Sequence, residues 1–232
     1  MNPSGGASAG ERLDGPSAGF ARLVVAVASE LRGHREELNC LDGVAGDGDL
    51  GLTVSTAAQA LQELAPVLAS LAEREAIRTC GIEIARRAPS TGGTLIAFAM
   101  MAASKADVSP TASPAERAAG YLEVAAASIA QRGQVAAGDR TMLDALLPAT
   151  AAVRAAAARG DGAATAAGDA ARAAEEGASA TTSMAAKVGR AGWLAERAAG
   201  HEDAGARLVA LAFAAATGAT APAATGERSS TA

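Results

Sequence analysis

The sequence predicts an all-α protein, and three observations support that prediction. Hydrophobic residues make up 50% of the 232-residue chain, but aromatic residues make up only 2%. Alanine supplies much of the apolar content, and it has the highest helix propensity and little to offer a pleated sheet. Apolar side chains recur at three- and four-residue steps, first from Phe20 to Leu31, and short glycine-containing turns separate these segments.

About eight helices are expected, and local signals place several of their ends. Proline disfavours helix in the residue before it, so the third helix ends before Pro89. Ser113, Pro114 and Glu116 have the spacing of a helix start, with serine as the cap. Residues 164–187 are expected to form one or two helices, interrupted near Gly177. The expected helices cover about residues 17–40, 52–71, 73–87, 93–105, 113–132, 141–159, 164–187 and 204–217. Their short connections are typical of an up-and-down bundle.

The chain is expected to form one domain between two tails. Residues 1–16 and 218–232 are small, polar and rich in residues that break regular structure, which predicts disorder. The domain then covers residues 17–217, a length that is enough for a substantial core.

Charge, hydropathy and cysteine usage exclude several classes of protein. The formal net charge is −5, with acids and bases mixed, whereas a nucleic-acid-binding protein normally carries a basic face. The most apolar run, residues 94–103, is too short to span a bilayer, and no signal peptide is visible. Cys40 and Cys80 are not a CxxC pair and suit a reducing compartment. We therefore expect a cytoplasmic protein without a membrane or nucleic-acid partner.

The strongest chemical signal is the segment DGVAGDGDLG, residues 42–51. Asp42, Asp47 and Asp49 place three carboxylates within eight residues. Their spacings of five and two do not share one helix face, so convergence requires a turn, which the intervening glycines allow. Converging anions repel one another unless cations neutralise them. Oxygen ligands suit Mg²⁺ or Ca²⁺ rather than zinc, and a site that shares its ligands between carboxylates and phosphates is the usual Mg²⁺ arrangement. The alternative is a solvated acidic turn, because Asp and Gly are both turn residues.

Two further polar segments precede expected helices. The first, PSTGG at residues 89–93, can cradle a phosphate at a helix N-terminus, or Ser90 or its neighbouring threonine can simply cap that helix. In the second, GDRTM at residues 138–142, Asp139 or Thr141 is a candidate cap for the next helix. The chain has no GxxxxGK[ST] loop, so any use of nucleotide follows another design.

The last polar segments lie near the C-terminus. Arg190 can grip a phosphate through its fork of donors, or it can pair with Glu196 on the surface. Trp193 is expected to pack rather than to stack on a base. Asp203 is expected to cap the last helix, and His201 is a weaker candidate for a catalytic base.

Together these segments resemble the DhaL family, the Dak2 domain of dihydroxyacetone kinases. The matching segments, in chain order, are LDGVAGDGDLG, APSTGGTL, RGQVAAGDRTMLDALLPA and KVGRAGWLAERAAGHEDAGA. The resemblance covers residues 18–216. It implies an antiparallel eight-helix barrel that binds ADP or ATP at one end, where Asp42, Asp47 and Asp49 hold two Mg²⁺ ions.

The resemblance also implies which residues shape the nucleotide pocket. They are Leu50, Gly51, Leu52, Thr53, Pro89, Ser90, Arg132, Gly133, Thr141, Met142, Arg190, Asp203, Ala204 and Gly205. The sequence departs from many family members at two of these positions, with Leu50 in place of histidine and Ala204 in place of proline.

The implied reaction is phosphoryl transfer, in which the protein mainly positions the reactants and neutralises charge. Arg190 joins the three aspartates as a catalytic candidate. A separate DhaK-like subunit would hold dihydroxyacetone or another small ketose, and in some relatives a phosphotransferase-system protein supplies the phosphoryl group. Two alternatives remain: the Dak2 fold also occurs in fatty-acid kinases, for which a deep apolar cavity would be the sign, and a nucleotide-binding regulatory module is the other.

Overall fold

The computed structural model describes residues 13–188, 192 and 195–220, and within these residues the chain is helical without a strand. The helices are α1 (Ala18–Gly33), α2 (Arg35–Ala45), α3 (Leu50–Glu63), α4 (Ala65–Ser70), α5 (Glu73–Arg87), α6 (Thr91–Ala103), α7 (Pro114–Gly133), α8 (Leu143–Arg159), α9 (Ala163–Ala180), the 3₁₀ turn η1 (Thr181–Ser183), α11 (Ala195–Ala198) and α12 (Ala204–Thr220). None of the described helices combines the length and apolar character that crossing a bilayer would require.

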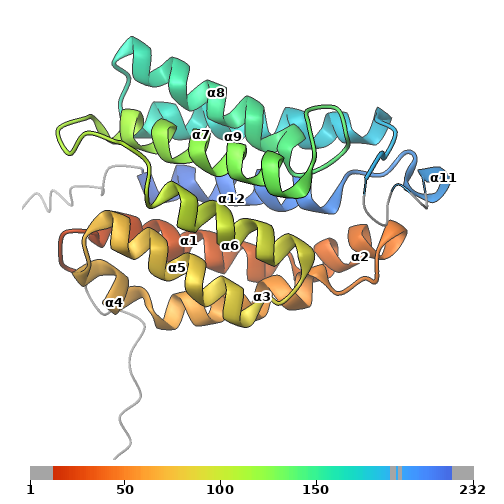
Figure 1. The fold of residues 1–232 in the computed structure, drawn as a ribbon, viewed down its shortest axis with the longest axis horizontal. Coiled ribbons are helices and arrows are strands. Elements are labelled where there is room, and N and C mark those ends of the chain that lie inside the picture. The colour runs from red at the N-terminus through yellow and green to blue at the C-terminus, as the bar shows by residue number, and fades with distance from the viewer. Residues whose placement is uncertain (1–12, 189–191, 193–194, 221–232) are drawn as a thin grey trace, which may run out of the picture.

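Eight described helices of 13 to 20 residues form a closed ring. In ring order they are α1, α3, α5, α6, α7, α8, α9 and α12, and α12 packs back against α1. Neighbouring helices run in opposite directions (Figure 1). The prediction of an all-α antiparallel eight-helix barrel is confirmed, and the short α2, α4 and α11 lie at the ends of the ring.

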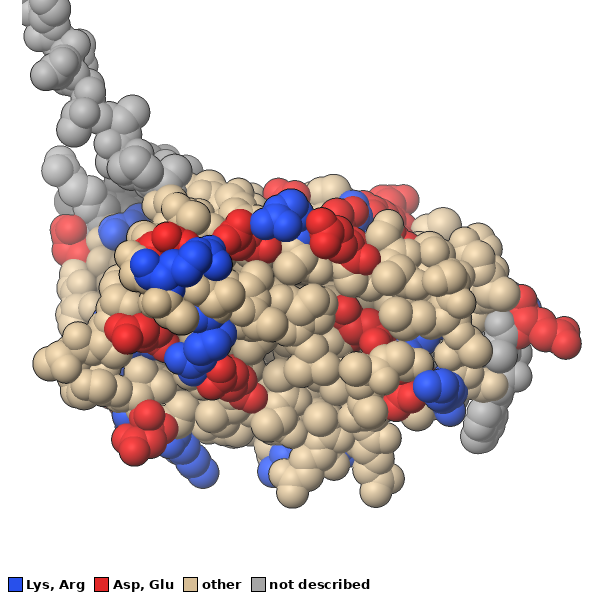
Figure 2. Space-filling model, turned by 90° about the horizontal axis from the view of Figure 1, so that it is seen from above, with Lys and Arg blue, Asp and Glu red and all other residues tan. Residues whose placement is uncertain are grey.

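Alanine lets the helices approach closely. On α9, buried alanines recur every four residues and form one face: Ala166, Ala170, Ala174 and Ala178. This face packs against α8 and α12, where the fully buried Leu143 anchors the main core cluster. A helix can approach such a face more closely than one lined by larger side chains. On the outer face seen in Figure 2, basic and acidic side chains lie interspersed.

Two predicted helices are in fact pairs of helices. The segment 17–40 breaks at His34, whose imidazole lies between Glu30 and Glu37, with ring nitrogens 3.1 and 2.6 Å from their carboxylates. The segment 52–71 breaks at Leu64, two residues before Pro66, which occupies the first turn of α4. Each break therefore has a local feature beside it, the two glutamates around the His34 ring and the proline that follows Leu64.

The predicted interruption at Gly177 was wrong, because α9 continues to Ala180. Gly177 lies against the carbonyl of Asp144 on α8, so close that a Cβ atom would collide with it. This glycine thus serves close helix packing and not a chain break. Other ends were predicted well: α5 has the expected bounds, and Ser113 and Glu116 form a reciprocal capping box at the start of α7.

Both cysteines are free, in line with their unpaired spacing in the sequence. Cys80 is fully buried on α5, and burial raises the pKa of its thiol to about 12. Cys40 is exposed on α2.

Candidate functional site

The antiparallel ring brings the described parts of the four family-matching segments to one end of the barrel. Because the helices alternate in direction, the α2–α3, α5–α6 and α7–α8 connections, the end of α9 and the start of α12 all lie there (Figure 1). Segments that are more than 100 residues apart in the sequence therefore form one surface.

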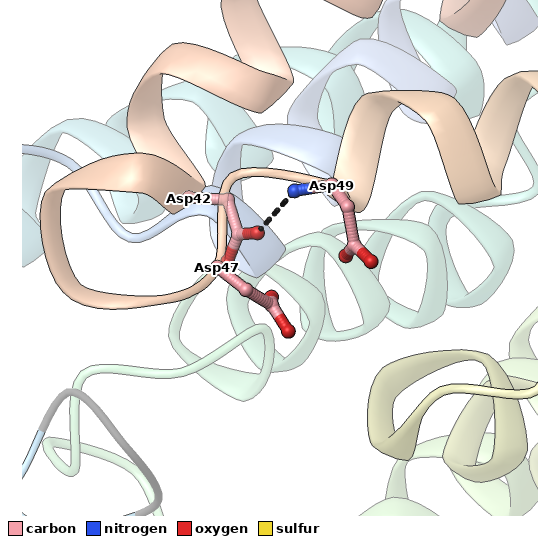
Figure 3. Close-up of side chains that lie close together, drawn as sticks. All are labelled: Asp42, Asp47 and Asp49. Carbon is pink, nitrogen blue, oxygen red and sulfur yellow. Dashed lines mark hydrogen bonds between the residues drawn. The ribbon is translucent and has the colours of Figure 1, made fainter.

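Three carboxylates converge at this end. Asp42 lies in the last turn of α2, because that helix continues to Ala45 and not only to residue 40 as expected. Asp47 and Asp49 follow in the turn before α3, and their side chains extend to the same side of that turn (Figure 3). One oxygen from each of the three carboxylates lies within 4.8 Å of the others.

The turn folds around the carboxylate of Asp42. Its Oδ2 accepts hydrogen bonds from the backbone N–H groups of Gly48 at 2.9 Å, Asp49 at 3.1 Å and Leu50 at 3.3 Å. Gly48 has a φ of +76°, a left-handed conformation that glycine adopts without strain. The position of Asp42 is thus fixed by the chain itself.

These three residues fit a hard divalent cation. Octahedral Mg²⁺ binds oxygens at about 2.1 Å, so ligand atoms on one ion lie about 3.0 Å apart when adjacent and about 4.2 Å apart when opposite. The carboxylate oxygens lie within 4.8 Å of one another, so they would close in on a single ion by side-chain rotation or would be shared between two ions. Asp47 and Asp49 are exposed, so further positions around the ion are open to phosphate or water.

Contacts on α2 that were not predicted from the sequence hold Asp42 in place. Arg207 on α12 donates from Nε to Glu37 at 2.6 Å and from Nη1 to Glu175 on α9 at 2.9 Å. Asn39 accepts a hydrogen bond from the backbone N–H of Leu52 at 3.2 Å and so caps the first turn of α3. Asn39 precedes Asp42 by three residues, which places both side chains on one face of a helix. A predicted helix that continued past residue 40 would therefore have placed Asn39 beside Asp42.

The α7–α8 loop is organised by a residue that was not predicted. Asp144 is buried, and its carboxylate accepts from the backbone N–H groups of Gly138 at 2.5 Å and Thr141 at 2.8 Å. The Thr141 hydroxyl accepts from Leu143 N–H at 3.2 Å just before α8, whose N-cap residue, Met142, makes no side-chain cap. The spacing Thr141-x-x-Asp144 is that of a capping box, which was the signal available in the sequence.

The other candidate, Asp139, contacts a different segment. It accepts from the backbone N–H of Ala136 at 2.8 Å and from Lys187 Nζ at 3.1 Å. The N–H of Ala136 and then Lys187 hold the pKa of the Asp139 carboxyl below its usual value.

Two predicted helix caps are confirmed. Ser90 accepts a hydrogen bond from Gly93 N–H at 3.1 Å at the start of α6. Asp203 accepts from Ala206 N–H at 2.8 Å in the first turn of α12, and its own N–H donates to the Thr181 hydroxyl at 2.9 Å. Burial raises the pKa of the Asp203 carboxyl, although the N–H of Ala206 opposes the shift.

Some residues of the predicted nucleotide pocket lie around one apolar cavity inside the barrel. The cavity has a volume of about 420 Å³. The predicted residues that line it are Leu50, Thr53, Ser90, Met142 and Gly205. Gly205 lies against Met142, since a Cβ atom at residue 205 would be 3.4 Å from that of Met142. The residues that line the cavity therefore come from the start of α3, the start of α6, the α7–α8 loop and the start of α12.

Other predicted pocket residues lie apart from this cavity. Leu52 is 48% exposed on the outer side of α3, in a surface hollow with Arg32 and Arg35. Arg132 stacks on the ring of Phe98, with its guanidinium carbon 3.9 Å from the ring centre. The remaining positions lie as follows: Gly51 is buried under the carbonyl of Arg35, Pro89 is exposed, Gly133 contacts Val135, and Ala204 is the half-buried first residue of α12. The predictions for Arg190 and Trp193 fall outside the described residues.

Comparison with known proteins identifies the family. The DAK2 domain matches residues 44–218, and the chain belongs to this family. The D-erythrulose kinase of Mycolicibacterium smegmatis is 34% identical over 216 residues, which are 90% of this chain and 37% of the kinase. The ADP-binding subunit DhaL of the PEP-dependent dihydroxyacetone kinase of Escherichia coli is 28% identical over 174 residues, which are 75% of this chain and 83% of the subunit.

Solved structures share the fold. The dihydroxyacetone kinase of C. freundii in its native form superposes with a TM-score of 0.69 at 26% identity, covering 94% of this chain and 38% of the kinase. Its complex with AMP-PNP and Mg²⁺ gives a TM-score of 0.67 at the same identity. The chain thus spans little more than a third of the length of the erythrulose kinase and of the C. freundii enzyme.

Proposed function

We propose that this chain is the ADP- or ATP-binding unit of a cytoplasmic kinase for dihydroxyacetone or a similar small ketose. The observation that carries the proposal is the convergence of Asp42, Asp47 and Asp49 at the end of the barrel where the other matched segments meet. The names of the relatives support the reaction class, since they include an erythrulose kinase and an ADP-binding kinase subunit. The complex of the C. freundii enzyme with AMP-PNP and Mg²⁺ supports the ligands.

In this proposal the three aspartates hold two Mg²⁺ ions against the nucleotide phosphates. Bound Mg²⁺ would neutralise charge on the transferring phosphoryl group. Ser90 accepts a hydrogen bond from Gly93 N–H, which leaves its own hydroxyl proton available to a phosphate oxygen at the start of α6. Arg190 would supply a further positive charge, and Met142 and Gly205 would form part of the pocket wall.

The sugar would be held outside this chain. We propose a DhaK-like subunit as the partner that binds the ketose, and either ATP or a phosphotransferase-system protein as the source of the phosphoryl group. The likeness to the E. coli ADP-binding subunit supports a separate sugar-binding partner. The exposure of Asp47 and Asp49 supports transfer across the surface at this end of the barrel.

Calorimetry tests the nucleotide step. ADP and ATP are titrated into the purified, nucleotide-free chain with Mg²⁺ and with EDTA, beside Asp47→Ala. The matched control is Asp107→Ala, which removes an exposed aspartate from the α6–α7 connection at the opposite end of the barrel. We expect Mg²⁺-dependent binding that Asp47→Ala loses and Asp107→Ala keeps. Absence of binding by the well-folded wild-type chain would overturn the proposal.

A second candidate function rests on the interior of the barrel. The apolar cavity of about 420 Å³ falls within the range of about 300–1,000 Å³ that is typical of small-molecule sites. We therefore keep a unit of a fatty-acid kinase system as the alternative. Phosphorylation of a carrier-bound fatty acid, with no transfer to dihydroxyacetone or erythrulose, would favour it. Nucleotide binding without transfer to either substrate, with every partner supplied, would instead favour a regulatory module.

A further inference from the structure

Arg140, in the α7–α8 loop, is buried and has an unusual backbone conformation. Its side chain is 4% exposed, and its φ of +62° lies in the left-handed region that residues with a side chain rarely adopt. Buried arginines are uncommon unless their charge and donors are matched by partners. Both features call for contacts that compensate them.

The guanidinium binds the backbone of a distant segment. Its Nη2 donates to the carbonyl oxygens of Ala198 at 2.9 Å and His201 at 2.8 Å, and it lies 3.4 Å from that of Glu202. The carboxylate of Asp203 is close enough to interact with the positive charge. Among the described residues the Nε atom is buried without a hydrogen-bond partner. The Arg140 guanidinium thus binds the chain between the end of α11 and the start of α12.

The bonds made by Arg140 join two segments of the proposed nucleotide site. Arg140 directly precedes Thr141 and Met142 in the sequence, and its acceptors end directly before Asp203. Beyond this junction, Gly205 lies against Met142, and both residues line the interior cavity. The hydrogen bonds therefore hold the α7–α8 loop close to residues 198–202, two segments that are far apart in the sequence.

We infer that Arg140 is a positioning residue that holds residues 198–202 against the α7–α8 loop, so that Met142 and Gly205 form one wall of the nucleotide site. This inference rests on the proposed function. Arg140 acts through these segments, so its loss is expected to weaken nucleotide binding while the acidic turn keeps its Mg²⁺ ligands. The neighbouring contact of Lys187 with Asp139 is a surface ion pair, which is normally weak, and so does not replace it.

The test compares Arg140→Met, which keeps much of the apolar side chain and removes all donors, with Arg140→Lys, which restores one charged donor group. The control is Arg154→Met, the same change at an arginine that is 47% exposed and pairs with Glu123. Affinity for ADP in saturating Mg²⁺ is measured by calorimetry, and hydrogen exchange is followed at Asp203 and Ala206. A role in stability alone would lower the melting temperature and leave the affinity of the folded protein unchanged.

We expect Arg140→Met to weaken ADP binding at least tenfold and to speed exchange at both amides, Arg140→Lys to recover part of the affinity, and Arg154→Met to match the wild type. In an active kinase assay, the KM for nucleotide should rise more than kcat falls. Wild-type affinity in folded Arg140→Met, or in Arg140→Lys if the methionine variant does not fold, overturns the inference. Failure of the wild type to bind Mg²⁺ and ADP overturns the proposed function, and the positioning role with it, whereas loss in the Arg140 variants alone supports both.

Discussion

Two connections at the same end of the barrel, α2–α3 and α7–α8, are each organised by an aspartate that accepts hydrogen bonds from backbone N–H groups. At the α7–α8 connection, Asp144 in the first turn of α8 is buried, and its two oxygens accept from the backbone N–H groups of Gly138 and Thr141. In the α2–α3 turn, Asp42 also accepts backbone N–H groups, but through Oδ2 alone, and exposed Asp47 and Asp49 stand beside it. Aspartate thus has two roles at this end of the barrel. At the α7–α8 connection it is satisfied by backbone donors, and in the α2–α3 turn exposed carboxylates lie close enough together to ligate a cation.

The comparison shows that residue type and local spacing do not decide the role of an aspartate. Burial removes water from a carboxylate, so it must be satisfied by donors of the protein, as Asp144 is. Several exposed carboxylates within ligand distance of one another, as in the acidic turn, repel one another, and a bound cation relieves that repulsion. Substitution of Asp42 is therefore expected to affect ligand binding, and substitution of Asp144 is expected to affect stability.

Substitution of Asp42 should have the largest effect on ligand binding. In Asp42→Asn the amide oxygen can still accept from Gly48, Asp49 and Leu50, but the charged ligand is lost. Since changes in residues that merely support a metal ligand cost about 10–100-fold in affinity, we expect loss of the ligand itself to weaken Mg²⁺-dependent ADP binding by about 100-fold or more. Calorimetry measures the affinity, and a thermal melt close to that of the wild type checks the fold.

Asp107→Asn is the control for this experiment, because it removes the same charge at the opposite end of the barrel. Near-wild-type ADP binding by Asp42→Asn would mean that the α2–α3 connection is a solvated acidic turn, and the contrast between the two loops would disappear.

Substitution of Asp144 should act on stability instead. Asp144→Ala leaves the N–H groups of Gly138 and Thr141 without their acceptor, and an unsatisfied buried donor costs about 1–3 kcal/mol. We expect the free energy of unfolding to fall by about 2–4 kcal/mol on this basis, measured by urea denaturation with an unchanged m-value. The dependence of ADP binding on Mg²⁺ should persist in the folded variant. A stability equal to that of the wild type would show that these hydrogen bonds do not close the loop.

Much of the fold was predictable because alanine content, helical spacing and turn residues agree along the chain. The errors had two kinds of cause. Gly177 has the composition of a break, but α9 continues through it because the backbone of α8, distant in the sequence, approaches it. At His34 the ring contacts Glu37, which is only three residues away but is held in turn by Arg207 of α12. The periodicity of apolar residues registers neither contact.

Some residues of the candidate site could be predicted from the sequence, and others could not. The acidic trio could be singled out because its spacing demands a turn, and a capping pattern was present to reveal Asp144. Nothing in the sequence pointed to Arg140, because its acceptors are backbone carbonyl oxygens, which every residue carries whatever its side chain. The course of α2 through Asp42 was also missed, since the glycines of that segment favoured a loop.

The smallest effects should appear in the pH dependence of stability, where two aspartates near the α7–α8 loop are expected to differ in sign. Hydrogen bonding by Ala136 N–H, together with Lys187, lowers the pKa of Asp139 below its ordinary 3.8. Its ionised form therefore stabilises the fold above the unfolded pKa, and this contribution is lost as the pH falls through the folded pKa. Burial raises the pKa of Asp203 above 3.8, so its protonated form stabilises the fold in acid, and this contribution is lost as the pH rises through the folded pKa.

Urea midpoints measured from about pH 3 to pH 8 test this opposition of signs. We expect Asp139→Asn to match the wild type in strong acid and to become less stable than it as the pH rises. Asp203→Asn should also match the wild type in strong acid but become more stable than it at higher pH, because asparagine keeps the helix cap without a buried charge. If Asp203→Asn instead followed Asp139→Asn, the N–H groups of α12 and the charge of Arg140 would outweigh burial at Asp203. That carboxylate would then belong with Asp144, as an anion that the fold itself satisfies.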